Sequence, residues 1–197
     1  MAYTHLQPAE PTTLGYRLSF YAQDLVSEYE FFTTKFEIKG KGFKEAVGTA
    51  ASYIELLGKE NYLKFEQFIS NQLDLPFFKI VNQTYPRLQD FTVLSHCAGI
   101  ASALYKFAFD LRLMQSPPIG ELAEPFGKKQ VGSSAMPFKR NPIRSEKIDS
   151  LGRMLAQMPA IAWHDAAHSL LERTLDDSSN RRTILPETFL ILDEMLT

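Results

Sequence analysis

The segment from Pro86 to about Gln115 constrains the fold most, because its helical pattern is apolar on nearly every side. Small residues crowd its middle, namely Ala98, Gly99, Ala101, Ser102 and Ala103. A helix that is apolar all round is buried all round. A chain of 197 residues has few neighbouring helices with which to wrap it. We therefore expect other copies of the chain to complete its burial in a long-helix bundle.

The rest of the chain also shows helical periodicity. Further helices are predicted over four ranges, 13–36, 59–73, 142–171 and 181–196. Pro159 lies inside the third of these and predicts a kink near residues 155–159. No segment alternates between apolar and polar residues with a period of two. The sequence therefore predicts an all-α fold, with residues 1–197 forming one helical-bundle domain.

A long loop is predicted over residues 117–141, and loops of that length are usually functional or disordered. Its end, Gly132 to Pro142, contains Ser133, Lys139 and Asn141. We expect Gly132 to supply a positive φ angle, and Asn141–Pro142 to begin a helix with Asn141 as its N-cap. A hydroxyl, a cation and a helix N-terminus together favour an anion-binding site. The simpler alternative is an ordinary connection.

Composition excludes several classes of protein. A net charge of −2 gives no electrostatic reason for binding nucleic acid or an acidic membrane surface. No run approaches the roughly 18 apolar residues of a membrane span, and the first residues lack the pattern of a signal peptide. Cys97 is the only cysteine, so no intramolecular disulfide is expected. We expect a cytoplasmic protein.

Three separated segments concentrate polar residues: Thr4–Ala9, the end of the long loop, and Glu172–Arg182. The loop resembles the signature of the fumarase/aspartase superfamily, whose members eliminate fumarate from a substituted succinate. The segment Leu171–Ser178, together with Thr4–His5 and Gln83–Tyr85, is most similar to the branch that cleaves adenylosuccinate. The resemblance covers essentially the whole chain, and its motifs stand in the family's order.

The resemblance implies a β-elimination in which Ser133 is the base and His5 the general acid. A serine hydroxyl is a poor base at neutral pH, so its alkoxide needs nearby positive potential. Lys139, loop amides and a helix N-terminus at Pro142 are the expected sources. An unperturbed histidine has a pKa near 6.5, which makes both of its protonation states available near neutrality.

The same resemblance implies the residues that bind substrate. Arg173 and Arg182 would bind planar oxyanions, and Ser178 would bind a phosphate from a turn before a helix. The remaining substrate-binding residues would be Thr4, Gln83, Lys139 and Asn141. The alternative for the arginines is a solvated cluster paired with Glu172, Asp176 and Asp177, which suits Arg181 well. Lys147 stands where some relatives have an arginine, so it is left out of this set.

A second motif is similar in spacing to a metal site. His164 and His168 lie four residues apart, as in the HExxH zinc motif, but Asp165 takes the place of the glutamate. No third ligand is evident, although Glu172 lies one turn further along. We therefore expect no metal and no cofactor, and interpret the two histidines as packing or pocket-rim residues.

The resemblance begins inside the family's central domain, so the sequence is expected to be a segment that lacks the family's N-terminal and C-terminal domains. The family implies a homotetramer with active sites shared between subunits, and an isolated segment without activity. Two alternatives stay open. One is another fumarate-releasing lyase of the superfamily, such as one acting on argininosuccinate. The other is an inactive oligomerisation scaffold.

Overall fold

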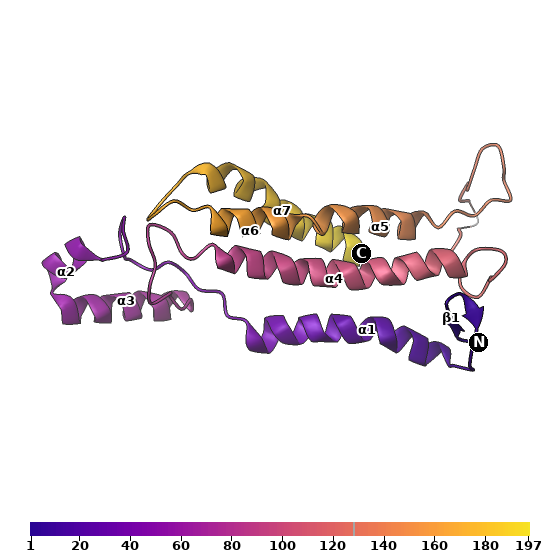
Figure 1. Ribbon diagram of the computed structural model, residues 1–197, viewed down its shortest axis with the longest axis horizontal. Helices are drawn as coiled ribbons and strands as arrows, with labels where there is room; N and C mark the ends of the chain where they lie inside the picture. Colours follow the sequence, from indigo (N-terminus) through magenta and orange to yellow (C-terminus); the bar gives the residue numbers. More distant parts are fainter. Residues whose placement is uncertain (128) are drawn as a thin grey trace. The chain divides into compact units, whose positions relative to one another are not determined.

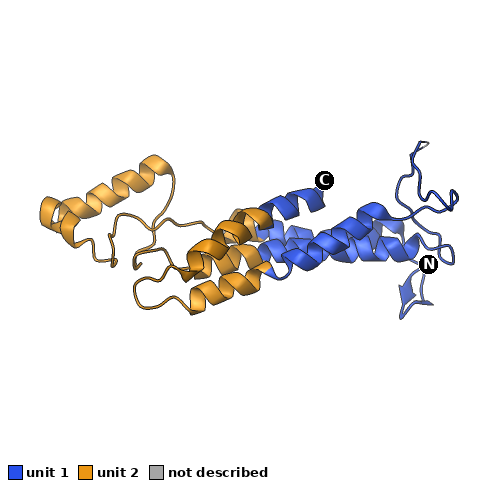
Figure 2. Cartoon of the chain, turned by 90° about the horizontal axis from the view of Figure 1, so that it is seen from above, with its two compact units in different colours: residues 1–30, 96–157, 188–197 blue, residues 31–95, 158–187 orange. Residues whose placement is uncertain are grey.

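The computed structural model describes residues 1–127 and 129–197, and Lys128 of the expected loop lies outside them. The chain divides into two compact units, coloured separately in Figure 2. Unit 1 contains residues 1–30, 96–157 and 188–197, and unit 2 contains residues 31–95 and 158–187. Helices α4 (Leu88–Met114) and α7 (Asp176–Leu196) each contribute residues to both units (Figure 1).

The all-α prediction is confirmed, and most helices lie where the periodicity placed them. Helix α1 (Leu14–Glu30) continues as one π-helical turn, η1 (Phe31–Lys35), which together match the predicted range 13–36. Helix α3 (Lys59–Leu73) matches the second prediction, and α2 (Ala51–Leu57) is an additional short helix. The described part of 117–141 contains no regular helix or strand.

Three local predictions were wrong. Strands β1 (Tyr3–Thr4) and β2 (Gln7–Pro8) form a hairpin where no strand was expected. The helix predicted over 142–171 is two helices, α5 (Ile143–Leu155) and α6 (Met158–Ala167), although their break falls where the kink was predicted, near residues 155–159. Pro159 explains the break, because its ring clashes with the carbonyl four residues earlier, at Leu155.

The third error concerns the start of α7, which begins at Asp176 and not at Arg181. The polar residues 176–180 read as a turn, but two carboxylates in a first helical turn are favoured by the helix dipole. Asp176 also accepts a hydrogen bond from the hydroxyl of Thr174 at 2.8 Å. Residues 176–180 therefore form the first turn of the helix.

The core of unit 1 is built from α1, α4, α5 and the end of α7. Gly152 of α5 lies against Tyr105 of α4 and Met195 of α7, so those three helices approach most closely where α5 has no side chain. On the other side of α4, Tyr21 of α1 donates a hydrogen bond to Asp110 at 2.7 Å and packs edge-on against Phe107. Leu155 is fully buried in this unit.

Helix α4 keeps several large apolar side chains exposed, including Leu88, Phe109 and Leu113. That exposure agrees with the expectation that other copies of the chain cover the helix, which stays a prediction. No helix among the described residues combines the length and the apolar character that crossing a membrane requires.

Unit 2 combines an aromatic cluster with a polar interior. The rings of Phe43, Tyr53, Phe65 and Phe77 contact one another around α2 and α3. Between α6 and the start of α7, Asn180 donates a hydrogen bond to Asp165 at 2.8 Å. The second carboxylate oxygen of Asp165 and the amide oxygen of Asn180 are buried without a partner among the described residues.

This arrangement predicts that Asp165→Asn stabilises the protein at pH 7. Burial raises the pKa of Asp165, and the nearby carboxylates of Asp177 and Asp90 raise it further against the hydrogen bond from Asn180. A raised pKa means that the folded state favours the neutral acid, so the free energy of unfolding falls as the pH rises from the unfolded to the folded pKa. Asp165→Asn has no such carboxyl group, so its free energy of unfolding does not fall in this way. The difference in stability between the variant and the unaltered protein becomes smaller as the pH is lowered.

Thermal unfolding at a series of pH values measures this difference. Asp24→Asn, at an exposed position of α1, is the control and should leave the pH dependence unchanged. A lower melting temperature for Asp165→Asn at pH 7 would mean that the carboxylate is ionised and well paired.

Candidate active site

The nine residues expected to act on substrate fall into two sets. Unit 1 holds Thr4, His5, Ser133, Lys139 and Asn141, and unit 2 holds Gln83, Arg173, Ser178 and Arg182. Each set is described within its own unit. In both units the residues of each predicted motif lie together on one loop or helix end. Their hydrogen-bond partners differ from those that the sequence predicted.

His5 lies in the two-residue turn of the β1–β2 hairpin. Thr4 pairs with Gln7, and Tyr3 pairs with Pro8. His5 and Leu6 both have left-handed backbone angles, with φ of 52° and 60°. Two positive φ angles characterise the type I′ turn, which usually contains asparagine or glycine. Histidine and leucine here cost about 1–2 kcal/mol each, a strain of the kind often found at functional sites.

The hairpin borders a cavity of about 790 Å³ in unit 1. Thr4, His5, Tyr16, Phe20 and Met114 are among the residues that line it. The walls come mainly from α1 and α4, so the imidazole stands at the edge of a largely apolar space. A histidine placed there is open to solvent and able to exchange a proton with a bound molecule.

The Ser133 loop closes on itself at Gly132. A side chain at position 132 would overlap the carbonyl oxygen of Lys139, so glycine is required for this close approach. Gly132 does not have the positive φ angle that the sequence predicted. Asn141 donates from its side-chain amide to the carbonyl of Gly132 at 3.3 Å, which ties the two ends of the loop together.

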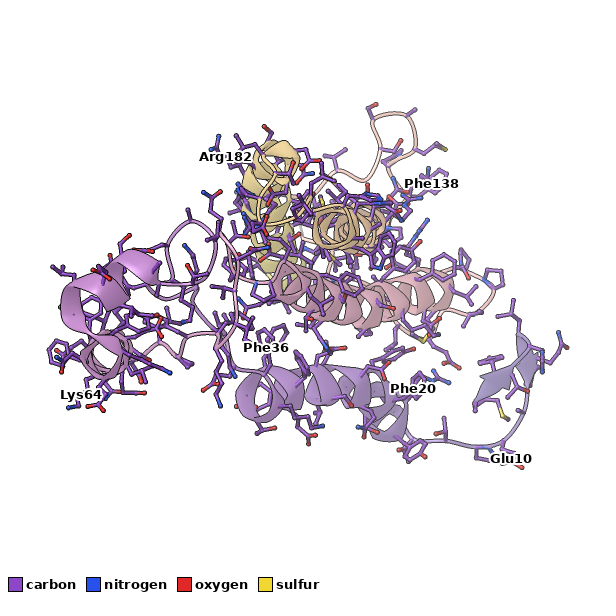
Figure 3. The ribbon with its side chains drawn as sticks, turned by 60° about the vertical axis from the view of Figure 1, so that its left-hand side comes forward. Glu10, Phe20, Phe36, Lys64, Phe138 and Arg182 are labelled. Atoms are coloured by element: carbon purple, nitrogen blue, oxygen red, sulfur yellow. The ribbon has the colours of Figure 1, made fainter. Side chains whose placement is uncertain are left out.

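Ser133 follows the glycine and receives a backbone hydrogen bond. Its hydroxyl oxygen accepts from the amide of Met136 at 3.2 Å. A loop amide therefore points at the oxygen that is expected to carry negative charge, as predicted. The side chain of Lys139 is exposed, and so is Phe138 on the same loop (Figure 3).

The start of α5 is not the free anion site that the sequence predicted. The helix begins at Ile143, and its N-cap is Pro142, without a side-chain cap from Asn141. The carboxylate of Glu124 accepts hydrogen bonds from the amides of Arg144, at 3.2 Å, and Ser145, at 2.7 Å. It also accepts from the hydroxyl of Ser145 at 2.7 Å. An internal carboxylate thus occupies this helix terminus.

Glu124→Ala is therefore expected to destabilise the protein by about 1–2 kcal/mol, since it leaves the first amides of α5 without acceptors. Glu124→Gln keeps one acceptor oxygen and should fall between the alanine variant and the unaltered chain. Urea unfolding followed by circular dichroism measures the order of the three. Equal stability of all three would show that the hydrogen bonds at this terminus contribute nothing.

The hairpin and the long loop lie at the same end of the unit 1 helices (Figures 1 and 2). No hydrogen bond joins His5 to Ser133 within the described ranges. The proposed acid and base therefore share a region of unit 1 without contact between them.

In unit 2, the loop that holds Gln83 lies beside the loop before α7. The amide of Gln83 donates to the carbonyl of Glu172 at 3.3 Å, and Asn82 donates from its side chain to the carbonyl of Leu171 at 3.4 Å. Two loops 89 residues apart in sequence are thus joined. The side chain of Gln83 is exposed.

A cavity of about 650 Å³ adjoins these two loops. Asn82, Thr84, Arg87, Trp163, Ser169 and Leu171 are among the residues that line it. It therefore has both apolar and polar walls, with a guanidinium on one side. Gln83 and Arg173 are neighbours of the lining residues in sequence but do not line the cavity themselves.

Arg173 lies just before α7, and Ser178 lies in the first turn of that helix. Arg173 donates to the carboxylate of Asp177 at 2.8 Å. Ser178 lies inside the helix, and its amide already donates to the carbonyl of Leu175, so it does not precede the helix as predicted. Arg182 is exposed on α7 and forms no hydrogen bond or ion pair with the described residues (Figure 3).

Two buried ion pairs in this region were missed by the sequence analysis. Arg87 donates from Nε to Asp177 at 2.7 Å. Arg181 donates to Asp90 at 2.6 Å and to the hydroxyl of Tyr85 at 2.6 Å, so it is partly buried against Asp90 and does not belong to the expected solvated cluster with Glu172, Asp176 and Asp177. A signal did exist, because Arg87 and Asp90 are charged residues next to the apolar first half of α4.

The remaining candidates have structural partners. The rings of His164 and His168 stack at 5.2 Å between centroids, and both are exposed. No group of three or more metal-ligating side chains occurs among the residues that the structure describes. Lys147 forms an ion pair with Glu194 on the surface of unit 1.

Comparison with known proteins places the chain in a family. The sequence model of the lyase family matches residues 1–156. The chain is 40% identical to adenylosuccinate lyase of Schistosoma mansoni over 202 residues, covering 100% of the chain and 42% of that protein. It is 38% identical to the adenylosuccinate lyase of Schizosaccharomyces pombe, covering 100% of the chain and 41% of that protein. The chain thus spans about two fifths of the length of these relatives.

A solved structure supports the fold. The 3-carboxy-cis,cis-muconate lactonizing enzyme of Pseudomonas putida superposes with a TM-score of 0.79 at 22% sequence identity, covering 99% of the chain and 42% of that protein. At this identity the likeness concerns the helical architecture alone.

Proposed function

The chain belongs to the lyase family, and from that membership we propose that it carries the catalytic and substrate-binding residues of an adenylosuccinate lyase. The reaction is a β-elimination. A proton leaves the succinyl carbon next to a carboxylate, the C–N bond breaks, and the departing nitrogen is protonated. The products are fumarate and AMP. The succinylated aminoimidazole carboxamide ribotide of purine biosynthesis is the second proposed substrate.

Ser133 is the proposed base and His5 the proposed acid. The amide of Met136 supports the alkoxide of Ser133, and the cation of Lys139, six residues further along the same loop, is proposed to add to it. His5 suits proton donation because it is an imidazole, the side chain that most often serves as a general acid, and because it is exposed at the edge of a cavity. Thr4, Lys139 and Asn141 accompany them as proposed substrate ligands.

Gln83, Arg173, Ser178 and Arg182 are the proposed ligands in unit 2. The observation that carries this proposal is the pairing of the Gln83 loop with the Glu172–Arg173 loop beside a cavity of about 650 Å³. Two motifs that the resemblance had singled out separately are neighbours there. Arg173 and Arg182 supply the positive charge that a substrate with two carboxylates and a phosphate needs.

The activity is tested in a hybrid enzyme. The aligned segment of the Schistosoma mansoni relative is replaced by this chain, so that the relative supplies the other 58% of its own length, the complement of the 42% that the chain matches. The purified hybrid should release fumarate from adenylosuccinate and not from argininosuccinate, as measured by chromatography of the products. A folded hybrid that releases no fumarate would support the scaffold alternative. A preference for argininosuccinate would assign another lyase.

We also propose a homotetramer that works in the cytoplasm, with active sites completed between subunits. The exposed apolar side chains of α4 support the assembly, because a partner copy would bury them. Sedimentation of the chain tests the assembly, because a tetramer has four times the 22.4 kDa mass of one chain. A monomer at micromolar concentration would contradict it.

A further inference from the structure

The guanidinium of Arg173 is held by a carboxylate that is itself buried. Asp177 has a side chain only 3% exposed, and its two oxygens accept from two different arginines. Arg173 donates to one oxygen at 2.8 Å, and Arg87 donates to the other at 2.7 Å. Burial works against ionisation of Asp177, but the hydrogen bonds from both arginines lower its pKa below the ordinary value. Asp177 is therefore a fixed carboxylate between two cations.

The two arginines differ in how open they are. The side chain of Arg87 is 8% exposed, and its guanidinium lies 4.9 Å from the centre of the Tyr85 ring. The side chain of Arg173 is 22% exposed and uses one guanidinium N–H within the described residues. Arginine has five such donors, so Arg173 keeps four for another acceptor. Arg87 thus anchors the carboxylate from inside, and Arg173 faces outward.

The group of Arg87, Asp177 and Arg173 differs in net charge from the neighbouring pair of Arg181 and Asp90. The two guanidinium groups and the carboxylate of Asp177 have a combined net charge of +1. Arg181 and Asp90 form a second ion pair in the same unit, whose net charge is zero. Arg181 also donates a hydrogen bond to the hydroxyl of Tyr85, which leaves it fewer donors for another acceptor. An incoming oxyanion is therefore attracted to the first cluster and not to the second.

We propose that Asp177, anchored by Arg87, is a positioning residue that orients Arg173 toward an anionic group of the substrate. The inference rests on the proposed function, because it takes Arg173 as a substrate ligand. A single ion pair to Asp177 fixes one edge of the planar guanidinium and leaves the other edge free for two parallel hydrogen bonds. Asp177 itself does not touch the substrate.

The test is calorimetric titration with adenylosuccinate of the hybrid enzyme described above, slowed by Ser133→Ala so that the substrate is not consumed during the titration. Asp177→Asn keeps the shape of the side chain but loses its charge, and should weaken binding at least about tenfold. Arg173→Lys should weaken binding to a similar extent. In the double variant the losses should not add, because both changes remove the same oriented guanidinium. Asp176→Asn is the matched control, since the exposed Asp176 contacts only Thr174 among the described side chains.

Asp177→Glu is the second variant, for the case in which Asp177→Asn does not fold. It keeps the negative charge and lengthens the side chain by one methylene. It should recover part of the affinity that Asp177→Asn loses, which a purely structural role does not predict. Unchanged binding by a folded Asp177→Asn, with weaker binding by Arg173→Lys, would overturn the positioning role and leave the proposed function standing. Additive losses would also overturn it. Absence of binding by the folded hybrid with Arg173 and Asp177 intact would overturn both, and fumarate release by the hybrid with Ser133 intact tests the function separately.

Discussion

Replacing Ser133 by alanine in the hybrid enzyme is expected to lower the rate of fumarate release by about 10²–10⁴-fold, the usual contribution of a proton-transferring group. The reason is chemical, because no other group on the loop takes the proton from the succinyl carbon in the proposed reaction. The structural cost is small, since Ser133 accepts one hydrogen bond, from the amide of Met136, in a partly exposed loop. The Michaelis constant for adenylosuccinate should change much less than the turnover number.

Ser134→Ala is the matched control for this prediction. The two serines are adjacent, but only Ser133 has a hydroxyl that the structure shows accepting a loop amide. Chromatographic assay of fumarate from both variants, with melting temperatures measured in parallel, gives the comparison. A large loss of turnover in Ser134→Ala, together with normal turnover in Ser133→Ala, would contradict the prediction and assign the base to Ser134.

Replacing Leu155 by alanine is expected to lower the free energy of unfolding by about 2–5 kcal/mol. Leu155 is 0% exposed at the end of α5, in the core of unit 1. The substitution removes buried apolar atoms and leaves a cavity, because α5 is already held close to α4 and α7 at Gly152. The surrounding helices can therefore move little to fill the cavity. The loss in the free energy of unfolding should lie toward the upper part of the range.

Met154→Ala, one residue earlier in the same helix, is the control. Met154 is 50% exposed, so its truncation should cost well under about 1 kcal/mol. Urea unfolding of both variants, followed by circular dichroism and fitted with the slope of the unaltered chain, measures the two losses. Similar losses at the two positions would mean that Leu155 is not in a rigid core.

The helices were predictable because their apolar residues recur over many turns. Helices α3 and α4 lie within two residues of their predicted limits. The β1–β2 hairpin was not predictable, because strands of two residues carry no periodic signal and its turn uses His5 and Leu6 where glycine or asparagine is usual. The start of α7 was missed because acidic and small polar residues favour both turns and first helical turns.

The candidate site also has parts that were predictable from the sequence and parts that were not. Residues that belong to short motifs, such as Ser133 and Asn141, lie on the loop where the sequence placed them. Their electrostatic surroundings depend on contacts between distant positions. Glu124 reaches the start of α5 from 20 residues away, and Arg87 meets Asp177 across 90 residues. No local pattern encodes such distances, so the capped helix terminus and the fixed carboxylate emerged only from the fold.

The cavity beside the Gln83 loop contains the chain's single tryptophan, Trp163, in its wall. All indole fluorescence of the chain therefore originates at one place, where the side chain is half exposed to solvent. A molecule that enters the cavity replaces water around that indole, and the emission spectrum records the exchange. The protein thus carries its own optical probe for this cavity, free of background from any other indole.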